Sequence, residues 1–212
     1  MRKAAKAASL VLTAALVVGV GISAFAATTT PSKTVVDEVA ASVETTTTGE
    51  GTIVTTESKK VAKTEEEKTE VNTRTQQAVN NIGASVDLKK ETGATEEERV
   101  EVAAAEEVTV VENTLPNDAK VTVNVKSEVV DTVYEEEEKV TVMIAIPVLN
   151  ADGTQKQDEN GKLVFTYEKV QATVKGGQLQ LNLTNAQLKK FGKKFTVIAL
   201  KNVQKTTPAA AQ

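Results

Sequence analysis

The stretch that decides the fold runs from Val170 to Leu183 and reads VQATVKGGQLQLNL. Apolar and polar residues alternate on both sides of Gly176-Gly177. A period of two places the apolar side chains of a strand on one face, and a Gly-Gly pair supplies the turn of a hairpin. The stretch therefore predicts two antiparallel strands, with Leu179, Leu181 and Leu183 facing a core.

Strand patterns surround this hairpin throughout the C-terminal half. Residues 121–125 alternate between Val and polar residues, and residues 140–148 indicate a longer strand that is apolar on both faces. In the strand before the hairpin, the apolar positions change parity at Glu168-Lys169, which predicts a β-bulge. Residues 195–200 indicate a closing strand. These short strands predict a mainly β fold with an Ig-like antiparallel β-sandwich over residues 113–205.

Helices are expected beside the strands. Residues 68–83 carry one apolar stripe. The stripe consists of Val71, Thr75, Ala78, Val79 and Ile82. Thr184 and Gln187 form a capping box for a two-turn helix that Gly192 ends. A similar box begins at Thr95 but runs into alternating valines, so both helix and strand stay open there.

The first 26 residues have the pattern of a secretory signal peptide. Residues 2, 3 and 6 are basic, residues 7–22 are uncharged and mostly apolar, and Ala24-Phe25-Ala26 presents small residues to a signal peptidase. Cleavage after Ala26 predicts a protein that is secreted or associated with the cell wall, with no membrane span after cleavage. The alternative is an uncleaved anchor, for which the apolar stretch is short.

Composition divides the remaining chain. Residues 27–67 are rich in Thr and Glu and include four consecutive threonines, so we expect a low-complexity flexible spacer. Residues 68–112 are expected to form a helical or mixed region that precedes the β-sandwich domain. Residues 206–212 are expected to be a disordered tail.

Missing residue types narrow the function. The chain has no His and no Cys, which removes most general-base, thiol and zinc sites, and it has no disulfides. Removing the signal leaves 22 basic residues against 29 acidic ones, a net charge of −7, so nucleic acid is not an expected partner. Aromatic residues make up 3% and Trp is absent, which disfavours stacking on sugar rings.

These features predict a non-enzymatic module, without catalytic or cofactor-binding residues, that binds an extracellular protein or a cell-wall component. Two alternatives stay open. A secreted enzyme or accessory subunit that uses only carboxylates would need two of them facing one cavity from different strands. An exported chaperone or assembly subunit that works by strand addition would need an unpaired edge strand.

The strongest metal-like pattern lies between residues 150 and 161. Asn150, Asp152 and Glu159 match the third, fifth and twelfth positions of a Ca²⁺ loop. The first-ligand position holds Val148, however, and Lys156 lies among the ligands. A hairpin tip with two glycine-containing turns is the alternative interpretation.

Charged groups elsewhere have simpler interpretations. The run from Glu135 to Glu138 is expected to be an exposed loop, because like charges repel and stay in water. Asp131 and Tyr134 are expected at the rim of the β-domain. The pairs Lys189-Lys190 and Lys193-Lys194 bracket Gly192 and could contact anionic wall polymers.

Two runs carry a resemblance to a known group of proteins. They are Asn81 to Leu88, which leads from helix to loop, and the hairpin Lys169 to Leu183. From about Gln76 onward the chain resembles small, uncharacterised secreted proteins of Gram-positive anaerobes. In those proteins a short helical region precedes a C-terminal Ig-like β-sandwich. The resemblance covers a little over half of the chain and implies no functional residues.

The mature protein is expected to begin at Ala27, because the basic, apolar and small-residue segments follow one another and end at Ala26. The intact mass of exported protein checks this prediction. Recovery of the uncleaved chain from the membrane fraction would contradict it.

Overall fold

The computed structural model describes residues 42–48 and 50–205. The predicted signal peptide and the predicted tail at 206–212 lie outside the described residues. Within the described residues, no helix combines the length and apolar character needed to cross a membrane.

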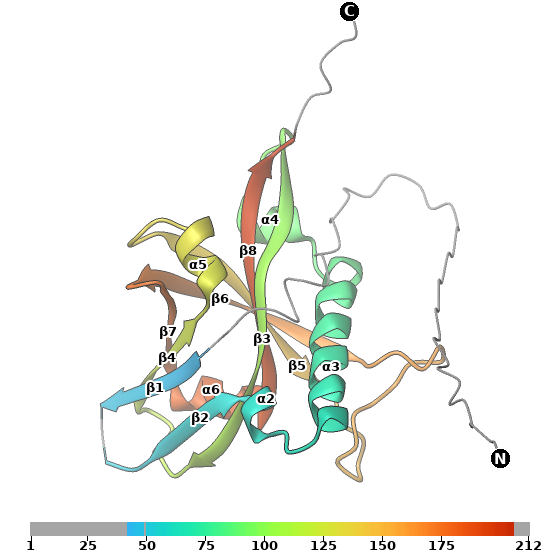
Figure 1. Cartoon of the computed structure of the whole chain (residues 1–212), viewed down its shortest axis with the longest axis vertical. Coiled ribbons are helices and arrows are strands. Elements are labelled where there is room, and N and C mark those ends of the chain that lie inside the picture. The colour runs from blue at the N-terminus through green and yellow to red at the C-terminus, as the bar shows by residue number, and fades with distance from the viewer. Residues whose placement is uncertain (1–41, 49, 206–212) are drawn as a thin grey trace, which may run out of the picture.

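The described chain contains eight strands and five helices (Figure 1). The strands are β1 (Ser42–Thr48), β2 (Ile53–Glu57), β3 (Glu98–Asn113), β4 (Lys120–Lys126), β5 (Lys139–Pro147), β6 (Phe165–Lys175), β7 (Gln178–Thr184) and β8 (Lys194–Gln204). The helices are α2 (Ser58–Val61), α3 (Glu65–Ser85), α4 (Leu88–Thr92), α5 (Glu128–Val133) and α6 (Asn185–Phe191).

All eight strands belong to one antiparallel sheet in the order β1-β4-β7-β6-β5-β8-β3-β2. The sheet curls into a nearly closed, barrel-like form, with β1 and β2 as its two end strands (Figure 1). The prediction of a mainly β, antiparallel fold is confirmed. The predicted Ig-like sandwich is not found, because the strands make one continuous curved sheet and three of them begin before residue 113.

The first two strands occupy much of the predicted spacer. In β1, Val43 is buried and Thr47 pairs with Val121 of β4, so the threonines at 45–48 lie in the sheet. β2 pairs along β3. Within the predicted spacer at 27–67, β1, β2 and α2 therefore form regular structure, whereas residues 27–41 and 49 lie outside the described residues. A segment with few apolar residues can still order when it adds backbone hydrogen bonds to an existing sheet.

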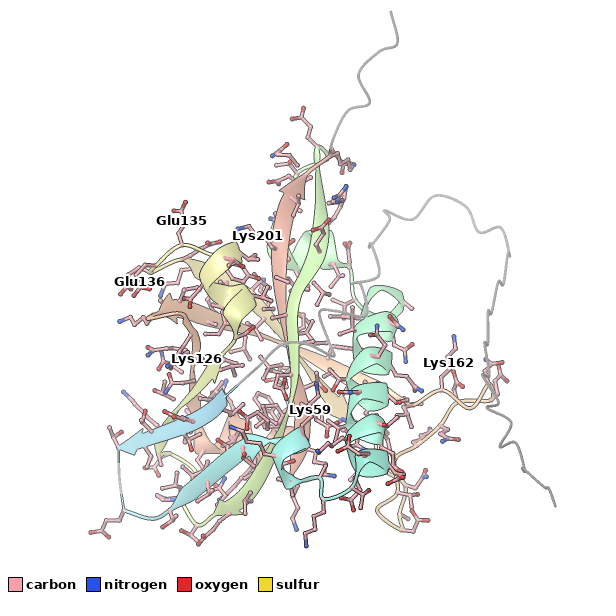
Figure 2. All side chains as sticks on the ribbon, viewed as in Figure 1. Lys59, Lys126, Glu135, Glu136, Lys162 and Lys201 are labelled. Carbon is pink, nitrogen blue, oxygen red and sulfur yellow. The ribbon has the colours of Figure 1, made fainter. Side chains whose placement is uncertain are left out.

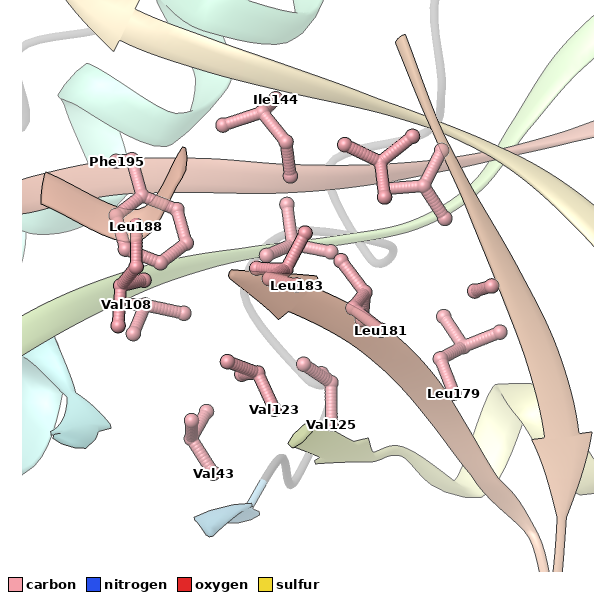
Figure 3. Close-up of a cluster of buried hydrophobic side chains, with 14 of the residues drawn as sticks. Val43, Val108, Val123, Val125, Ile144, Leu179, Leu181, Leu183, Leu188 and Phe195 are labelled. Atoms are coloured by element: carbon pink, nitrogen blue, oxygen red, sulfur yellow. The ribbon is translucent and has the colours of Figure 1, made fainter. Parts of the chain in front are cut away.

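The inward side chains form the main apolar core (Figure 3). Leu179, Leu181 and Leu183 are all buried, and the turn at Gly176-Gly177 joins β6 to β7 as predicted. The three leucines lie opposite Val125, Val123 and Val121 of β4. The hairpin that the sequence predicted therefore contributes one wall of the core.

A second apolar cluster lies on the outer face of the sheet, where α3 packs. The predicted stripe of α3 is buried at every position. In β5, Ile144 faces the main core whereas Met143 belongs to the outer cluster. In β8, Val197 and Ile198 divide in the same way. These strands are apolar on both faces because one face is covered by a helix.

β6 contains no bulge at Glu168-Lys169, and its register with β5 is continuous. Phe165 and Tyr167 pack in the outer cluster, whereas Val170 and Ala172 face the main core. The predicted bulge is wrong because it assumed that one face of the strand is buried along its whole length. The change of parity marks a change of buried face.

Two predicted capping boxes have different outcomes. Thr184 and Gln187 cap α6 reciprocally, as predicted. The amide of Thr95 donates to the Glu98 carboxylate (2.8 Å), but this turn leads directly into β3. The side-chain hydrogen bond of a capping box therefore forms at Thr95, but the alternating valines that follow form a strand and not a helix.

The mutation Leu181→Ala is expected to lower the free energy of unfolding by about 2 to 5 kcal/mol, because it removes a side chain that is 1% exposed and leaves a cavity. The exposed Glu136→Gln is expected to change the same quantity by about 0.5 kcal/mol or less. Urea unfolding of both variants checks the comparison. A larger loss for Glu136→Gln would contradict the assigned core face.

Candidate functional site

The three Ca²⁺ candidates lie on two separate turns of the β5–β6 connection. In the first turn, the Asp152 carboxylate accepts hydrogen bonds from the hydroxyl and amide of Thr154 (2.6 and 2.9 Å), which lowers the pKa of Asp152. Asn150 belongs to the same turn and donates to the Thr154 hydroxyl (3.0 Å). Glu159 belongs to the second turn, which is built on Asp158. Across the described ranges, no three His, Cys, Asp or Glu side chains gather to hold a metal ion.

The acidic run at 135–138 forms a structured turn beside the β6–β7 hairpin (Figure 2). The Glu136 carboxylate accepts a hydrogen bond from the amide of Gly176 (3.0 Å). The Glu138 carboxylate accepts one from the amide of Glu135 (2.8 Å). Glu137 Oε1 lies 3.5 Å from Lys175 Nζ, so three of the four carboxylates have local partners.

Asp131 and Tyr134 connect α5 to its neighbours. A Cβ atom on Gly177 would lie 2.0 Å from Asp131 Oδ1, so the Asp131 carboxylate lies directly against the hairpin backbone. Tyr134 is buried, which raises its pKa, and Lys201 Nζ lies 5.1 Å from the centre of its ring. These contacts are structural and form part of the core boundary.

Two adjoining hollows follow α3, and we call them together the α3 groove. The neutral end, of about 450 Å³, is lined by polar side chains that include Thr69, Thr73, Gln77 and Gln157. The basic end, of about 540 Å³, is lined by residues that include Ile146, Leu149, Lys190, Lys193 and Lys194. Arg74 and Gln155 line both ends and join them.

The groove exists because α3 has a polar stripe beside its buried stripe. Thr69, Thr73 and Gln77 are spaced by four residues and share one helix face. The β5–β6 connection lies alongside this face (Figure 1). Its Leu163 is fixed to the helix at both backbone groups: its amide donates to Gln77 Oε1 (2.9 Å) and its carbonyl accepts from Asn81 Nδ2 (3.1 Å). Both walls are therefore held in place.

An ion pair forms the junction between the two ends. Arg74 Nε and Nη2 donate to the two carboxylate oxygens of Glu107 (2.9 and 2.8 Å). Glu107 is only 3% exposed, and its carboxylate raises the pKa of Arg74. Such a bidentate pair is rigid and leaves little net charge at the junction.

The basic end offers more hydrogen-bond donors than acceptors. Lys190 pairs with Glu168, but no ion pair within 42–48 and 50–205 involves Lys193 or Lys194. Gln155 Nε2 is buried and has no hydrogen-bond partner in the described chain. Both oxygens of Glu107 already accept from Arg74. The unused groups therefore favour a ligand rich in acceptors.

A second unusual group, Glu106, faces the interior of the sheet. Glu106 is 4% exposed, and its Oε1 has no hydrogen-bond partner among the residues described. A cavity of about 10 Å³, close to the size of one water molecule, lies beside it, next to Ser127 and Leu179. Burial raises the pKa of Glu106 to about 7.

Charged groups from β2, α2 and β3 act on Glu106. Lys59 and Lys60 lower its pKa, whereas Glu57 and Glu107 raise it further. A buried carboxylate with a raised pKa is a feature that functional sites share with some structural networks.

Glu57 is the second inward carboxylate, on the neighbouring strand β2. Glu57 Oε1 accepts a hydrogen bond from the Val43 amide of β1 (3.1 Å) and lies 3.0 Å from Lys60 Nζ. A second contact joins the same two strands, since the Thr55 hydroxyl of β2 donates to the Thr45 hydroxyl of β1 (3.4 Å). Side chains of β2 therefore bridge the gap between the two end strands β1 and β2, which we call the seam.

Sequence reasoning found the lysines of the basic end but missed Arg74, Gln155 and the inward carboxylates. One signal for Glu106 was present: it shares its parity with Ala104 and Val108, which face the core. The partners of Arg74 and Gln155 lie far away in the sequence, so no local pattern could reveal them.

No protein-family model matches the chain, and no curated protein and no solved structure is significantly similar to it. The choice between sites therefore depends on their chemistry alone. The α3 groove has room for a ligand and unused donors, whereas the cavity beside Glu106 has room for one water.

The mutation Glu106→Gln is expected to stabilise the protein at pH 8 and to have little effect at pH 4. The folded pKa of Glu106 is about 7 against an ordinary 4.5, so folding favours its protonated form and stability falls as the pH rises between these values. The gap corresponds to a gain on the order of 3 kcal/mol for a neutral amide above pH 7.

Urea unfolding of both proteins at the two pH values checks this expectation, with the exposed Glu135→Gln as a control that should show no such pH dependence. An equal loss of stability for Glu106→Gln at both pH values would mean that the carboxylate has a stabilising partner.

Proposed function

We propose that this protein is a non-enzymatic, exported module that binds a protein or a cell-wall component through the α3 groove. The observation that carries the proposal is the groove itself, where unpaired lysine and amide donors line a hollow between two fixed walls. The signal-like pattern of residues 1–26 supports the extracellular part of the proposal.

The construction of the groove fits binding without large rearrangement. Leu163 is tied to α3 at both backbone groups, and Tyr167 donates its hydroxyl hydrogen to the carbonyl of Ala78 (2.7 Å). Walls that are ordered before binding reduce the entropy that a ligand must offset. The lack of His and Cys supports a binding role over catalysis.

A carboxylate-only enzyme is the second candidate, and one observation favours it. Glu57 and Glu106 lie on adjacent strands and both face the interior. Catalysis there would need space for a substrate, and the cavity beside Glu106 measures about 10 Å³. Glu57 has a structural role, because it joins β2 to β1. Glu106 is expected to lower the stability of the fold above pH 7, which the Glu106→Gln variant tests.

Strand addition is the third candidate. In the described part of the chain, β1 and β2 each pair with one neighbouring strand. A strand donated by a partner would have to displace the side-chain bridges between Glu57 and Val43 and between Thr55 and Thr45. These bridges protect both edges, which supports the groove over the seam as the binding surface.

The groove can be tested by filling its neutral end. Thr73→Trp adds a large side chain to an exposed position on the lining, and it is expected to reduce binding to purified Gram-positive cell walls at least about fivefold. Gln76→Trp is the matched control, because Gln76 lies on the same helix but does not line the groove. Sedimentation of the protein with walls measures the bound fraction.

The same assay is repeated with cell walls stripped of their surface proteins. Binding that persists indicates a cell-wall component, and binding that is lost indicates a protein partner. Equal binding by Thr73→Trp and the unmodified protein, or an equal loss with Gln76→Trp, would contradict the proposed function.

A further inference from the structure

We propose that the ligand of the α3 groove is a linear polymer that carries both anionic groups and free hydroxyls, such as an acidic polysaccharide or a polyol phosphate. This inference rests on the proposed binding function and adds the chemical class of the ligand. It follows from the different chemistry of the two ends of the groove.

The basic end provides the anion contacts. Lys193 and Lys194 are both exposed and line the hollow together with Lys190. Lys190 is already paired with Glu168, and Lys194 acts electrostatically on Glu67 at the start of α3. Three lysines thus line this hollow against a single carboxylate, Glu107, which Arg74 already holds, so the basic end favours an anion.

Apolar side chains also line the basic end. They include Ile146 and Leu149, and Leu149 is 60% exposed. Lysines and aliphatic side chains in one hollow suit a chain whose charged groups alternate with C–H surface. The carbon skeletons of sugars and polyols have that character, and aliphatic side chains contact them without the ring stacking that the low aromatic content disfavours.

The neutral end provides partners for hydroxyl groups. The hydroxyls of Thr69 and Thr73 donate to carbonyls within α3, so their acceptor positions stay available. The amide group of Gln77 keeps its donors, because only its Oε1 is used by Leu163. Hydroxyls both donate and accept, and they match such a mixed set.

One acidic side chain, Glu70, disfavours an anion at the neutral end. Glu70 lines it, is mostly exposed, and lies 3.9 Å from Arg74. A second anion would be repelled by Glu70, whereas an uncharged hydroxyl would not. The groove therefore favours a polymer whose anionic group sits among the lysines while its neutral part follows α3.

An acidic peptide fits the groove less well. Protein interfaces depend mainly on aromatic and Arg side chains in desolvated pockets. In this groove the Arg74 guanidinium is held by Glu107, and the neutral end is lined by hydroxyl and amide groups. These solvated hydroxyl and amide groups are better suited to a hydroxylated chain.

Four soluble polymers test the proposal with the mature protein. Poly(glycerol phosphate) and polygalacturonate carry anions and hydroxyls, poly-L-glutamate carries anions alone, and dextran carries hydroxyls alone. The first two are expected to bind at least about tenfold more tightly than the other two, and their binding is expected to weaken as salt is raised. Isothermal titration calorimetry at low and high salt measures these affinities.

A charge-matched pair of double variants locates the anion contacts. Lys193→Gln with Lys194→Gln is expected to raise the Kd for both acidic polymers about tenfold or more. Lys126→Gln with Lys175→Gln removes the same charge from other exposed lysines and is expected to change the Kd less than about twofold. Figure 2 shows Lys126 on the opposite side of the molecule from α3.

Several outcomes would overturn the inference. Equal binding of poly-L-glutamate would mean that charge alone suffices and would favour an acidic protein partner. If dextran bound as tightly as the acidic polymers, the lysines would not contribute to binding. If no soluble polymer binds but walls still bind through the position of Thr73, the ligand class is wrong while the proposed function stands. Loss of the Thr73→Trp effect on walls would instead contradict the proposed function itself.

Discussion

The burial of alternate side chains inside one curled sheet is the constraint on which the other features depend. The chain has no Cys and no Trp, so disulfides and the largest aromatic side chains contribute nothing to its stability. The main core instead combines Val, Leu, Ile and Ala side chains with two phenylalanines, Phe191 and Phe195, whose ring centres are 5.4 Å apart, and every strand contributes to it. Such a core excludes water only while the sheet stays curled, which explains why polar side chains bridge the seam between β1 and β2.

Local periodicity predicted several of the elements but not the closure of the sheet. The hairpin at Gly176-Gly177, the buried stripe of α3 and the capping box at Thr184 follow from spacing within one element, and all are present. Whether strands form two layers or one curved sheet depends on which strands pair, and that depends on partners far away in the sequence. The Thr-rich strand β1 shows this most clearly, since its order comes from pairing with β4 rather than from its own composition.

The candidate site could be predicted only in part for the same reason. Lys193-Lys194 stood out as a local charge pattern, but the groove beside them joins α3, the β5–β6 connection and the turn before β8. Gln155 and Arg74 acquire their roles from that junction, and neither belongs to a recognisable motif. The calcium-like spacing at Asn150 and Asp152 reflects turn chemistry, because Asx side chains bond to the backbone two residues later in tight turns.

One helix links the stability of this protein to its proposed binding surface. The buried stripe of α3 covers the outer face of the sheet over β3, β6 and β8, and the polar stripe next to it forms one wall of the groove. A ligand in the groove would therefore contact α3 and the β5–β6 connection together and would oppose their separation from the sheet. Binding and folding are then coupled through the same contacts, so that ligand binding adds to the stability of the helix–sheet packing.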